Sequence, residues 1–516
     1  MKIKHLLKWS FALLLCSITF NTFAKKAKKP NVLVIYTDDH RYTGIHALGG
    51  QAVRTPNMDQ LAHSGIVFTN AYLMGAFTGA TCVPSRAMLL TGRQLFKLDG
   101  VGKSIPKEHT TIGEAFGNAG YTTHMVGKWH QDNPSLARSF DDGDCVMSRG
   151  VYLVDHWRMP LWDWKKDGNY KKTEGWLLEY DENGNEVKRL IDLKNDKRGP
   201  TGTEKDGPHT SEIFARNAIK FIQEYDEKAP YFMYLAFHAP HDPRQAPQKY
   251  KDMYPEKDIT LTPSYMPQHP FDNGHLFLRD EELGPWPRTP EVARKHLSDY
   301  YAIITHLDAQ IGKVILALKA SGQYDNTIIV LAGDSGLGVG NHGLLGKQNV
   351  YDEDGVHVPL IISGGAVKQE GVRLDAYCYI HDIFPTVCDL AKIKKPASVT
   401  GKSLLPVING EQEQVRDFTY HAYRQHQRAY RKGDYKLLEF VKAPDKDWKL
   451  GELTRGSRTT LLFNIKNDPW ETTNLAFLPQ YFDLVKSMQK EMKEKAVKLG
   501  DDNANTGEQF DFWDYR

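Results

Sequence analysis

Residues suited to nucleophilic attack, proton transfer and metal binding recur at short spacings along the chain. Asp38 and Asp39 are adjacent, and Asp334 comes much later in the sequence. Clustered carboxylates favour a hard cation such as Ca²⁺, although a tandem Asp pair is also common at a helix start or a turn. The other segments that carry such groups are 82–86, 128–130, 238–241 and 343–351.

Cys82 begins the pentapeptide Cys-Val-Pro-Ser-Arg, and Leu-Leu-Thr-Gly-Arg follows at residues 89–93. A cysteine with activating neighbours is a nucleophile for covalent catalysis, whereas an isolated cysteine is more often a small buried side chain of the core. The spacing of Cys82, Pro84 and Arg86 favours the catalytic interpretation.

These residues resemble the signature of the formylglycine-dependent sulfatases in the alkaline phosphatase superfamily. The resemblance extends from about residue 29 to the Asn-Asp-Pro at residues 467–469, and its blocks follow the family's order. It implies that a maturation enzyme oxidises Cys82 to an aldehyde, formylglycine. A hydrated aldehyde carries two hydroxyls on one carbon, so one can attack sulfur while the other later loses its proton and expels sulfate.

The resemblance also implies a Ca²⁺ site. The family places paired Asp ligands where Asp38 and Asp39 stand, and a later Asp where Asp334 stands. The family usually has Asn or His after this later Asp, whereas Ser335 follows here, so the role of Ser335 stays open. The implied metal ligands are Asp38, Asp39, Cys82, Asp334 and Ser335.

Three further blocks resemble the family's substrate-binding segments. By this resemblance, Lys128 contacts the sulfate, His130 helps to reset the hydrate, His241 faces the scissile ester oxygen, and Lys347 is a second sulfate-binding lysine. Preorganised cations of this kind would neutralise a sulfuryl group, and histidines are suited to proton transfer. The implied catalytic residues are Cys82, Arg86, Lys128, His130, His241 and Lys347, of which Arg86, Lys128, His241 and Lys347 bind substrate.

Buried strands must position these side chains. The apolar runs 31–36, 231–237 and 327–332 are typical of strands buried on both faces, and each ends in polar residues. Open parallel sheets bind ligands at the carboxyl ends of their strands. Between the second and third runs, apolar residues recur at three and four positions from 293 to 320, which predicts an amphipathic helix. A further strand is predicted at 358–362 and a further helix at 381–391.

The pattern changes near residues 401–406. Short strand-like runs at 435–441 and 459–465 precede a charged helix at 479–499. We therefore expect an α/β fold with a large mixed, mostly parallel sheet sandwiched by helices, and a smaller C-terminal α+β subdomain with an antiparallel sheet and a helix. The expected boundaries are 25–415 for the catalytic domain and 416–516 for the C-terminal subdomain.

The N-terminus indicates export. Lys2, Lys4 and Lys8 precede the apolar run 9–20, and Ala24 stands at a position suited to cleavage. This arrangement is typical of a signal peptide, expected at residues 1–24. We expect a periplasmic or secreted protein without stable membrane insertion, because no later segment is predicted to be transmembrane. Whether Cys145, Cys378 and Cys388 pair is left open, although small core residues are favoured.

The composition of the chain argues against a nucleic-acid partner. The chain has 66 Lys and Arg against 64 Asp and Glu, a net charge of +2, so it shows no electrostatic footprint for nucleic acid. Nothing in the sequence indicates an oligomeric state.

The resemblance implies removal of O-sulfate from a sulfated carbohydrate, an algal polysaccharide or a glycosaminoglycan oligosaccharide. The alternatives are a phosphonate or phosphate ester hydrolase of the same superfamily and a non-catalytic glycan-binding protein.

Two surface features are candidates for glycan binding. Residues 155–164 combine three tryptophans with Arg158, as a sugar-binding rim would, although packing of the loop explains the aromatics equally well. Arg41, His46 and the segment 423–426 are further candidates for binding a polyanionic glycan.

Overall fold

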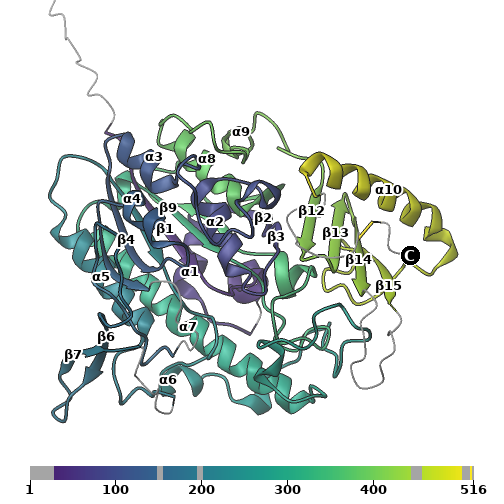
Figure 1. Ribbon diagram of the computed structural model, residues 1–516, viewed down its shortest axis with the longest axis horizontal. Helices are drawn as coiled ribbons and strands as arrows, with labels where there is room; N and C mark the ends of the chain where they lie inside the picture. Colours follow the sequence, from purple (N-terminus) through teal and green to yellow (C-terminus); the bar gives the residue numbers. More distant parts are fainter. Residues whose placement is uncertain are drawn as a thin grey trace, which may run out of the picture.

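An eight-stranded sheet with helices on both faces forms the larger part of the fold (Figure 1). The computed structural model describes residues 28–50, 52–147, 155–193, 201–442, 456–501 and 512–513. The predicted signal peptide, residues 1–24, lies outside the described residues.

The strand order of this sheet is β11-β2-β10-β9-β1-β8-β4-β5. Its neighbours pair in parallel except β10, which is antiparallel to both β9 and β2. The predicted mixed, mostly parallel sheet is therefore confirmed. The strands are β1 (Asn31–Thr37), β2 (Ile66–Tyr72), β4 (Thr122–Lys128), β5 (Asp142–Met147), β8 (Tyr231–Ala236), β9 (Thr327–Gly333), β10 (Leu360–Ser363) and β11 (Val372–Tyr379).

Alternate residues of β1 enter two separate cores. Val32 and Val34 pack with α2, α3, α4 and α8, whereas Leu33 and Ile35 pack with α1, α5 and α7. A strand buried on both faces has this pattern because successive side chains point to opposite sides. The helices are α1 (Pro56–His63), α2 (Cys82–Thr91), α3 (Ile112–Asn118), α4 (Asn133–Ser139), α5 (Thr210–Glu224), α7 (Pro290–Ala320) and α8 (Ile383–Leu390).

Helix α7 bears on the expectation that no later segment is transmembrane. By length and composition alone it could cross a membrane. In the structure, however, 78% of its most apolar window is buried inside the protein. The apolar stripe of α7, which resembles a membrane span in composition, therefore packs against the central sheet and α5.

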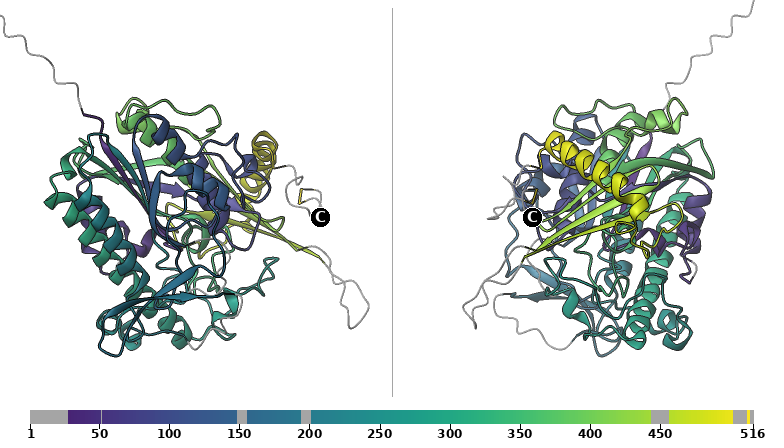
Figure 2. Two further views of the ribbon diagram at one scale, coloured as in Figure 1. Left: turned by 60° about the vertical axis from the view of Figure 1, so that its left-hand side comes forward. Right: turned by 90° about the vertical axis from the view of Figure 1, so that its right-hand side faces the viewer.

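A second sheet of five strands carries the C-terminal part, in the order β15-β14-β13-β12-β3. Strands β12 to β15 are antiparallel, and α10 lies across them (Figure 2, right). The elements are β3 (Gly75–Ala76), β12 (Thr419–Tyr423), β13 (Gln427–Lys432), β14 (Tyr435–Lys442), β15 (Ser457–Asn464) and α10 (Phe482–Leu499). The predicted α+β character of this part is confirmed.

The edge strand β3 connects the two sheets just before Cys82. It pairs in parallel with β12, where Gly75 faces Ala422. Gly75 has φ +126°, and a Cβ there would lie 1.9 Å from the carbonyl oxygen of Ala422. Only glycine fits this close approach.

The segment that contains residues 155–164 continues into a hairpin of β6 (Gly175–Tyr180) and β7 (Glu186–Ile191). Trp157 and Trp162 are buried there, with 6% and 3% exposure. These two rings therefore anchor the loop and do not form an exposed sugar-binding platform. Short helices include α6 (Gln248–Lys251), α9 (Leu405–Ile408) and the π-helical turn η7 (Asp352–Val356).

Candidate active site

The predicted site residues converge at the carboxyl ends of β1, β4, β8 and β9. Hydrogen bonds, ion pairs and close groupings of side-chain atoms link all ten of them into one buried cluster. Its members are Asp38, Asp39, Cys82, Arg86, Lys128, His130, His241, Asp334, Ser335 and Lys347.

The two acidic segments meet because β1 and β9 are paired in register up to Thr37 and Gly333. The next residues are Asp38, Asp39 and Asp334, and the backbone N–H of Asp39 donates a hydrogen bond to Asp334 Oδ1 at 2.8 Å. Asp39 has φ 61°, in the left-handed region. Such strained conformations cluster at functional sites.

The acidic cluster fits a hard cation. Potential ligand atoms of Asp38, Cys82 and Asp334 lie within 4.8 Å of one another, and so do those of Asp38, Asp39 and His241. Asp38 Oδ1 and Asp39 Oδ2 are buried and have no hydrogen-bond partner among the described residues. Buried carboxylate oxygens without partners are costly unless a cation compensates them.

The pKa values of these three carboxyls are shifted by burial and by neighbouring charges. Burial and the charge of Asp38 raise the pKa of Asp334 well above its usual value. Burial raises the pKa of Asp39 to about 6, against the opposing charge of Lys347. For Asp38 the effect of burial is outweighed by the charge of Lys128, which holds the pKa of this carboxyl well below its usual range. A divalent cation would favour the ionised form of all three.

Ser335 lies inside the cluster. Its hydroxyl donates to Asp39 Oδ1 at 3.2 Å and approaches Asp334 Oδ1 at 3.4 Å. Because the hydrogen points to a carboxylate, the lone pairs of the oxygen stay available to a cation.

Cys82 is the first residue of α2, so its side chain lies at the positive end of the helix. Its Sγ lies 3.3 Å from Nδ1 of His130, which has φ 63°. Burial raises the pKa of the Cys82 thiol to about 11, although Lys128 and Lys347 oppose this shift. The unmodified side chain is therefore a protonated thiol at neutral pH and a poor nucleophile.

Arg86 lies one helical turn after Cys82 and is fully buried. Its Nη1 donates to the carbonyl oxygen of Lys128 at 3.0 Å and to the Tyr234 hydroxyl at 3.1 Å. Its Nη2 lies 3.4 Å from Asp334 Oδ2 and 3.8 Å from Asp38 Oδ2. These contacts suit a residue that positions the acidic groups.

Two lysines contact the paired aspartates. Lys128, the last residue of β4, contacts Asp38 Oδ2, and Lys347 contacts Asp39 Oδ1. The charge of Asp39 raises the pKa of Lys347 well above its usual value, against the effect of burial. Lys347 is therefore cationic at the site.

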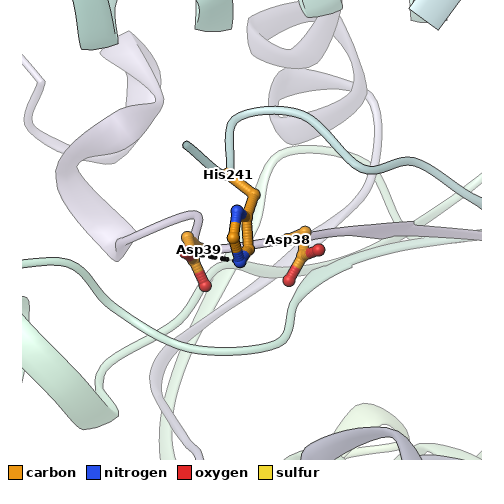
Figure 3. A group of neighbouring side chains, drawn as sticks. All are labelled: Asp38, Asp39 and His241. Atoms are coloured by element: carbon orange, nitrogen blue, oxygen red, sulfur yellow. Dashed lines mark ion pairs between the residues drawn. The ribbon is translucent and has the colours of Figure 1, made fainter. Parts of the chain in front are cut away.

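His241 faces the paired carboxylates (Figure 3). Its Nδ1 donates to the carbonyl oxygen of Asp242 at 2.7 Å, which leaves a lone pair on Nε2, 3.8 Å from Asp39 Oδ2. Burial, together with the charge of Lys347, holds the pKa of His241 well below its usual value, so the imidazole is neutral. A neutral imidazole can accept a proton or bind a cation.

Sequence reasoning assigned no role to His238 or Glu281. His238 Nδ1 lies 3.1 Å from Asp38 Oδ2 and 3.5 Å from the ammonium of Lys128. Its place three residues before His241 is a signal that was visible in the sequence. Glu281 accepts backbone N–H groups of Leu345 and Gly346 at 2.9 and 2.8 Å, and no sequence pattern indicated this contact.

We expect Glu281→Gln to lower kcat/KM about 10-fold, because a charge-assisted hydrogen bond to the segment that ends at Lys347 is worth about 1.5 kcal/mol. Steady-state kinetics of the two variants check this. Glu282→Gln, at an exposed neighbouring position, is the matched control. Equal kinetics for both variants would contradict a positioning role for Glu281.

The described cysteines do not form disulfides. Cys82, Cys145, Cys378 and Cys388 are free and buried. The expectation that the latter three are core residues is therefore confirmed.

Comparison with known proteins gives the family. Residues 30–393, more than half of the chain, match the family model described as sulfatase. Residues 340–498 match a model described as the C-terminal part of N-sulphoglucosamine sulphohydrolase.

Individual relatives match over most of their length. An ulvan-active sulfatase of Formosa agariphila is 28% identical over 96% of this chain and 86% of the relative. An N-acetylglucosamine-6-O-sulfatase of Bacteroides thetaiotaomicron is 26% identical over 95% and 90%. A solved structure in complex with its substrate D-glucosamine-2-N,6-O-disulfate has a TM-score of 0.70 at 22% identity, covering 93% of this chain and 100% of that one. The chain therefore belongs to the sulfatase family of hydrolases.

Proposed function

We propose that this chain is an exported, Ca²⁺-dependent sulfatase that removes O-sulfate from a sulfated carbohydrate, with formylglycine made from Cys82 as its nucleophile. The observation that carries the proposal is the buried cluster in which Cys82 lies beside Asp38 and Asp334 and within the field of two lysines. The cluster therefore combines a position for the nucleophile, carboxylates that can bind a metal cation, and lysines that can stabilise the negative charge of a sulfate group.

Asp38, Asp39, Asp334 and the side chain at position 82 would hold the Ca²⁺, with Ser335 beside them. When bound, Ca²⁺ supplies a Lewis acid that polarises a sulfate oxygen, and formylglycine supplies a hydrate with one hydroxyl for attack and one for release of sulfate.

The chain's own residues bind the ester and move protons. Lys128 and Lys347 neutralise the non-bridging sulfate oxygens, while Arg86 holds Asp334 in place. His130 lies 3.3 Å from Cys82 Sγ and is placed to take a proton from a group at that position. In this proposal His241 first takes up a proton at Nε2 and then donates it to the ester oxygen as the ester bond breaks.

The names of the two relatives support a carbohydrate substrate, since one acts on ulvan and the other on N-acetylglucosamine 6-O-sulfate. The rim of the site provides an exposed aromatic ring. Phe277 is 83% exposed, between His275, which contacts Tyr423, and Arg279, which is paired with Asp242 next to His241.

We expect Phe277→Ala to raise KM about 5- to 10-fold for a sulfated oligosaccharide, because an aromatic face that stacks on a sugar ring contributes about 1 kcal/mol beyond area burial. Sulfate release from an aryl sulfate should stay unchanged. Phe477→Ala, at an equally exposed ring on the C-terminal part, serves as the control. A loss on both substrates would contradict the platform role.

Export and modification complete the proposal. The leader at residues 1–24 would deliver the chain to the periplasm or the medium, and a formylglycine-generating enzyme would modify Cys82. N-terminal sequencing and mass spectrometry of the peptide that contains residue 82, from protein recovered outside the cytoplasm, test both. An intact leader or an unmodified thiol in active protein would refute them.

The direct test of the activity is an ion chromatogram of anions released from sulfated glycans and from one phosphate ester. Sulfate from a glycan is the expected result. Phosphate alone would favour the alternative, a phosphonate or phosphate ester hydrolase. No released anion from protein that carries the aldehyde would favour a glycan-binding role.

A further inference from the structure

Three side chains of the C-terminal part bind the backbone of the segment that follows Lys347. They contact every second residue of this segment, at positions 348, 350 and 352. The hydrogen bonds run from Gln427 Nε2 to the carbonyl oxygen of Gln348 at 3.2 Å, from Lys436 Nζ to the carbonyl oxygen of Val350 at 2.8 Å, and from the backbone N–H of Asp352 to Glu471 Oε2 at 2.6 Å.

The three side chains are buried, and two of them are charged. Lys436 Nζ also donates to Asp352 Oδ1 at 2.6 Å and to Glu471 Oε1 at 2.7 Å. Gln427 Nε2 also donates to the carbonyl oxygen of Asn273 at 3.3 Å. Hydrogen bonds to charged groups are the stronger ones in proteins, so residues 350–352 are held firmly against the second sheet.

The same part of the chain also holds the residues that precede Lys347. His342 Nε2 donates to the carbonyl oxygen of Glu471 at 3.1 Å, and His342 Nδ1 lies 2.7 Å from Asp354 Oδ2. Because both partners are acceptors, both ring nitrogens carry protons and the ring is an imidazolium. Burial opposes this state, but the charge of Asp354 raises the pKa of His342. The C-terminal part therefore contacts the segment on both sides of Lys347.

Gln348 connects these contacts to Lys347 and to the nucleophile segment. Its Oε1 accepts the backbone N–H of Lys347 at 3.0 Å, and its Nε2 donates to the carbonyl oxygen of Gly79 at 2.8 Å, three residues before Cys82. Its own carbonyl oxygen is the one that Gln427 holds. The backbone at residues 347 and 348 is therefore fixed relative to both Cys82 and the second sheet.

The position of this backbone decides where the Lys347 ammonium lies. Lys347 is buried, and its Nζ contacts Asp39 Oδ1 in the acidic cluster. A displacement of about 1 Å in a group that orients a substrate lowers a rate by about 100-fold. Contacts that fix residues 348–352 therefore bear directly on the site.

We propose that Gln427, Lys436 and Glu471 are positioning residues for Lys347, so that the C-terminal part places one of the two sulfate-binding lysines. This inference rests on the proposed function, in which Lys347 binds sulfate. The same three contacts also join the two sheets, so the test must separate an effect on Lys347 from a loss of stability.

Gln427→Met removes one backbone contact and leaves no buried charge unpaired. We expect it to lower kcat/KM for an aryl sulfate about 10-fold, the range for loss of one buried hydrogen bond. In a Lys347→Met background the same substitution should change kcat/KM by less than about 2-fold, because the group that it positions is gone. Gln323→Met is the matched control, since Gln323 donates to the carbonyl oxygen of Ile222 far from the site.

Lys436→Met is the stronger variant. It should lower kcat/KM about 100-fold and also lower the melting temperature, because Asp352 and Glu471 then lose the ammonium between them. Arg416→Met is its control: Arg416 is a largely buried cation paired with Asp382 by two hydrogen bonds. At a temperature where all variants are folded, this control should keep kcat/KM although its melting temperature falls.

Calorimetry with inorganic sulfate measures the same effect without turnover, and Gln427→Met should raise the Kd about 5-fold. Equal losses of kcat/KM in the unaltered and Lys347→Met backgrounds, or full activity of Gln427→Met, would overturn the positioning role and leave the sulfatase proposal intact. If the unaltered protein releases no sulfate from any ester while Gln427→Met still weakens sulfate binding, the proposed function is refuted and the positioning role stands.

Discussion

Cys82→Ala protein is expected to fold and to lose sulfate release by about 10⁴-fold or more, the scale of effect for removal of a catalytic nucleophile. The side chain is 2% exposed and small, so its truncation leaves only a small cavity in α2. Its loss removes the side chain that the proposal converts to an aldehyde. Ion chromatography of released sulfate, with circular dichroism to establish folding, measures both effects.

Cys388→Ala is the matched control, because Cys388 is also a buried cysteine in a helix, α8, and is not part of the cluster. It should keep full activity. Residual turnover by Cys82→Ala close to that of Cys388→Ala would refute covalent catalysis at position 82. The protonated Cys82 thiol leads to a second expectation: protein made without the maturation enzyme should be as inactive as Cys82→Ala.

The central sheet could be predicted from sequence because its strands are continuous apolar runs. The runs before Asp38 and Asp334 gave strand ends to within one residue, and β pairing then brings these acids together. The reversed direction of β10 and the two-residue strand β3 could not be predicted, because both depend on contacts with distant segments.

For the site, too, local sequence signals could be recognised, whereas contacts between distant segments could not. Cys82, Lys128 and His241 belong to short motifs, so their spacing could be recognised along the chain. Glu281 acts through the fold, because it holds the backbone of residues 345 and 346. Such a role depends on what a side chain contacts in space, which no spacing in the sequence encodes.

The aromatic residues show that residue type alone does not identify a sugar-binding surface. Trp157 and Trp162 are the type of residue that a sugar platform needs, but both are buried. Phe277 is 83% exposed and lies two residues before Arg279, which pairs with Asp242 next to His241. Burial therefore decides between packing and binding for the same residue type.

Asp39→Asn is expected to abolish the response of the protein to Ca²⁺ and to lower kcat/KM about 10³-fold, since a bound cation contributes several kcal/mol of transition-state stabilisation. Asn is nearly isosteric with Asp and tolerates the left-handed backbone at φ 61°. It keeps one oxygen but removes the negative charge, so the cluster loses charge without losing shape. Atomic emission analysis of bound Ca²⁺ and the melting temperature after chelation and readdition of Ca²⁺ measure the effect.

In the unaltered protein, chelation should lower the melting temperature, because Ca²⁺ at 100 times its Kd stabilises the folded state by about 2.7 kcal/mol. Asp308→Asn is the control: Asp308 is also buried, its pKa is also raised to about 6 by burial, and it accepts hydrogen bonds from Met58 and Asn57 in α1. It should keep the Ca²⁺ response even if its overall stability falls. A Ca²⁺ response in Asp39→Asn equal to that of the unaltered chain would show that Asp39 is not a ligand, and the unpartnered oxygens of the cluster would then need another explanation.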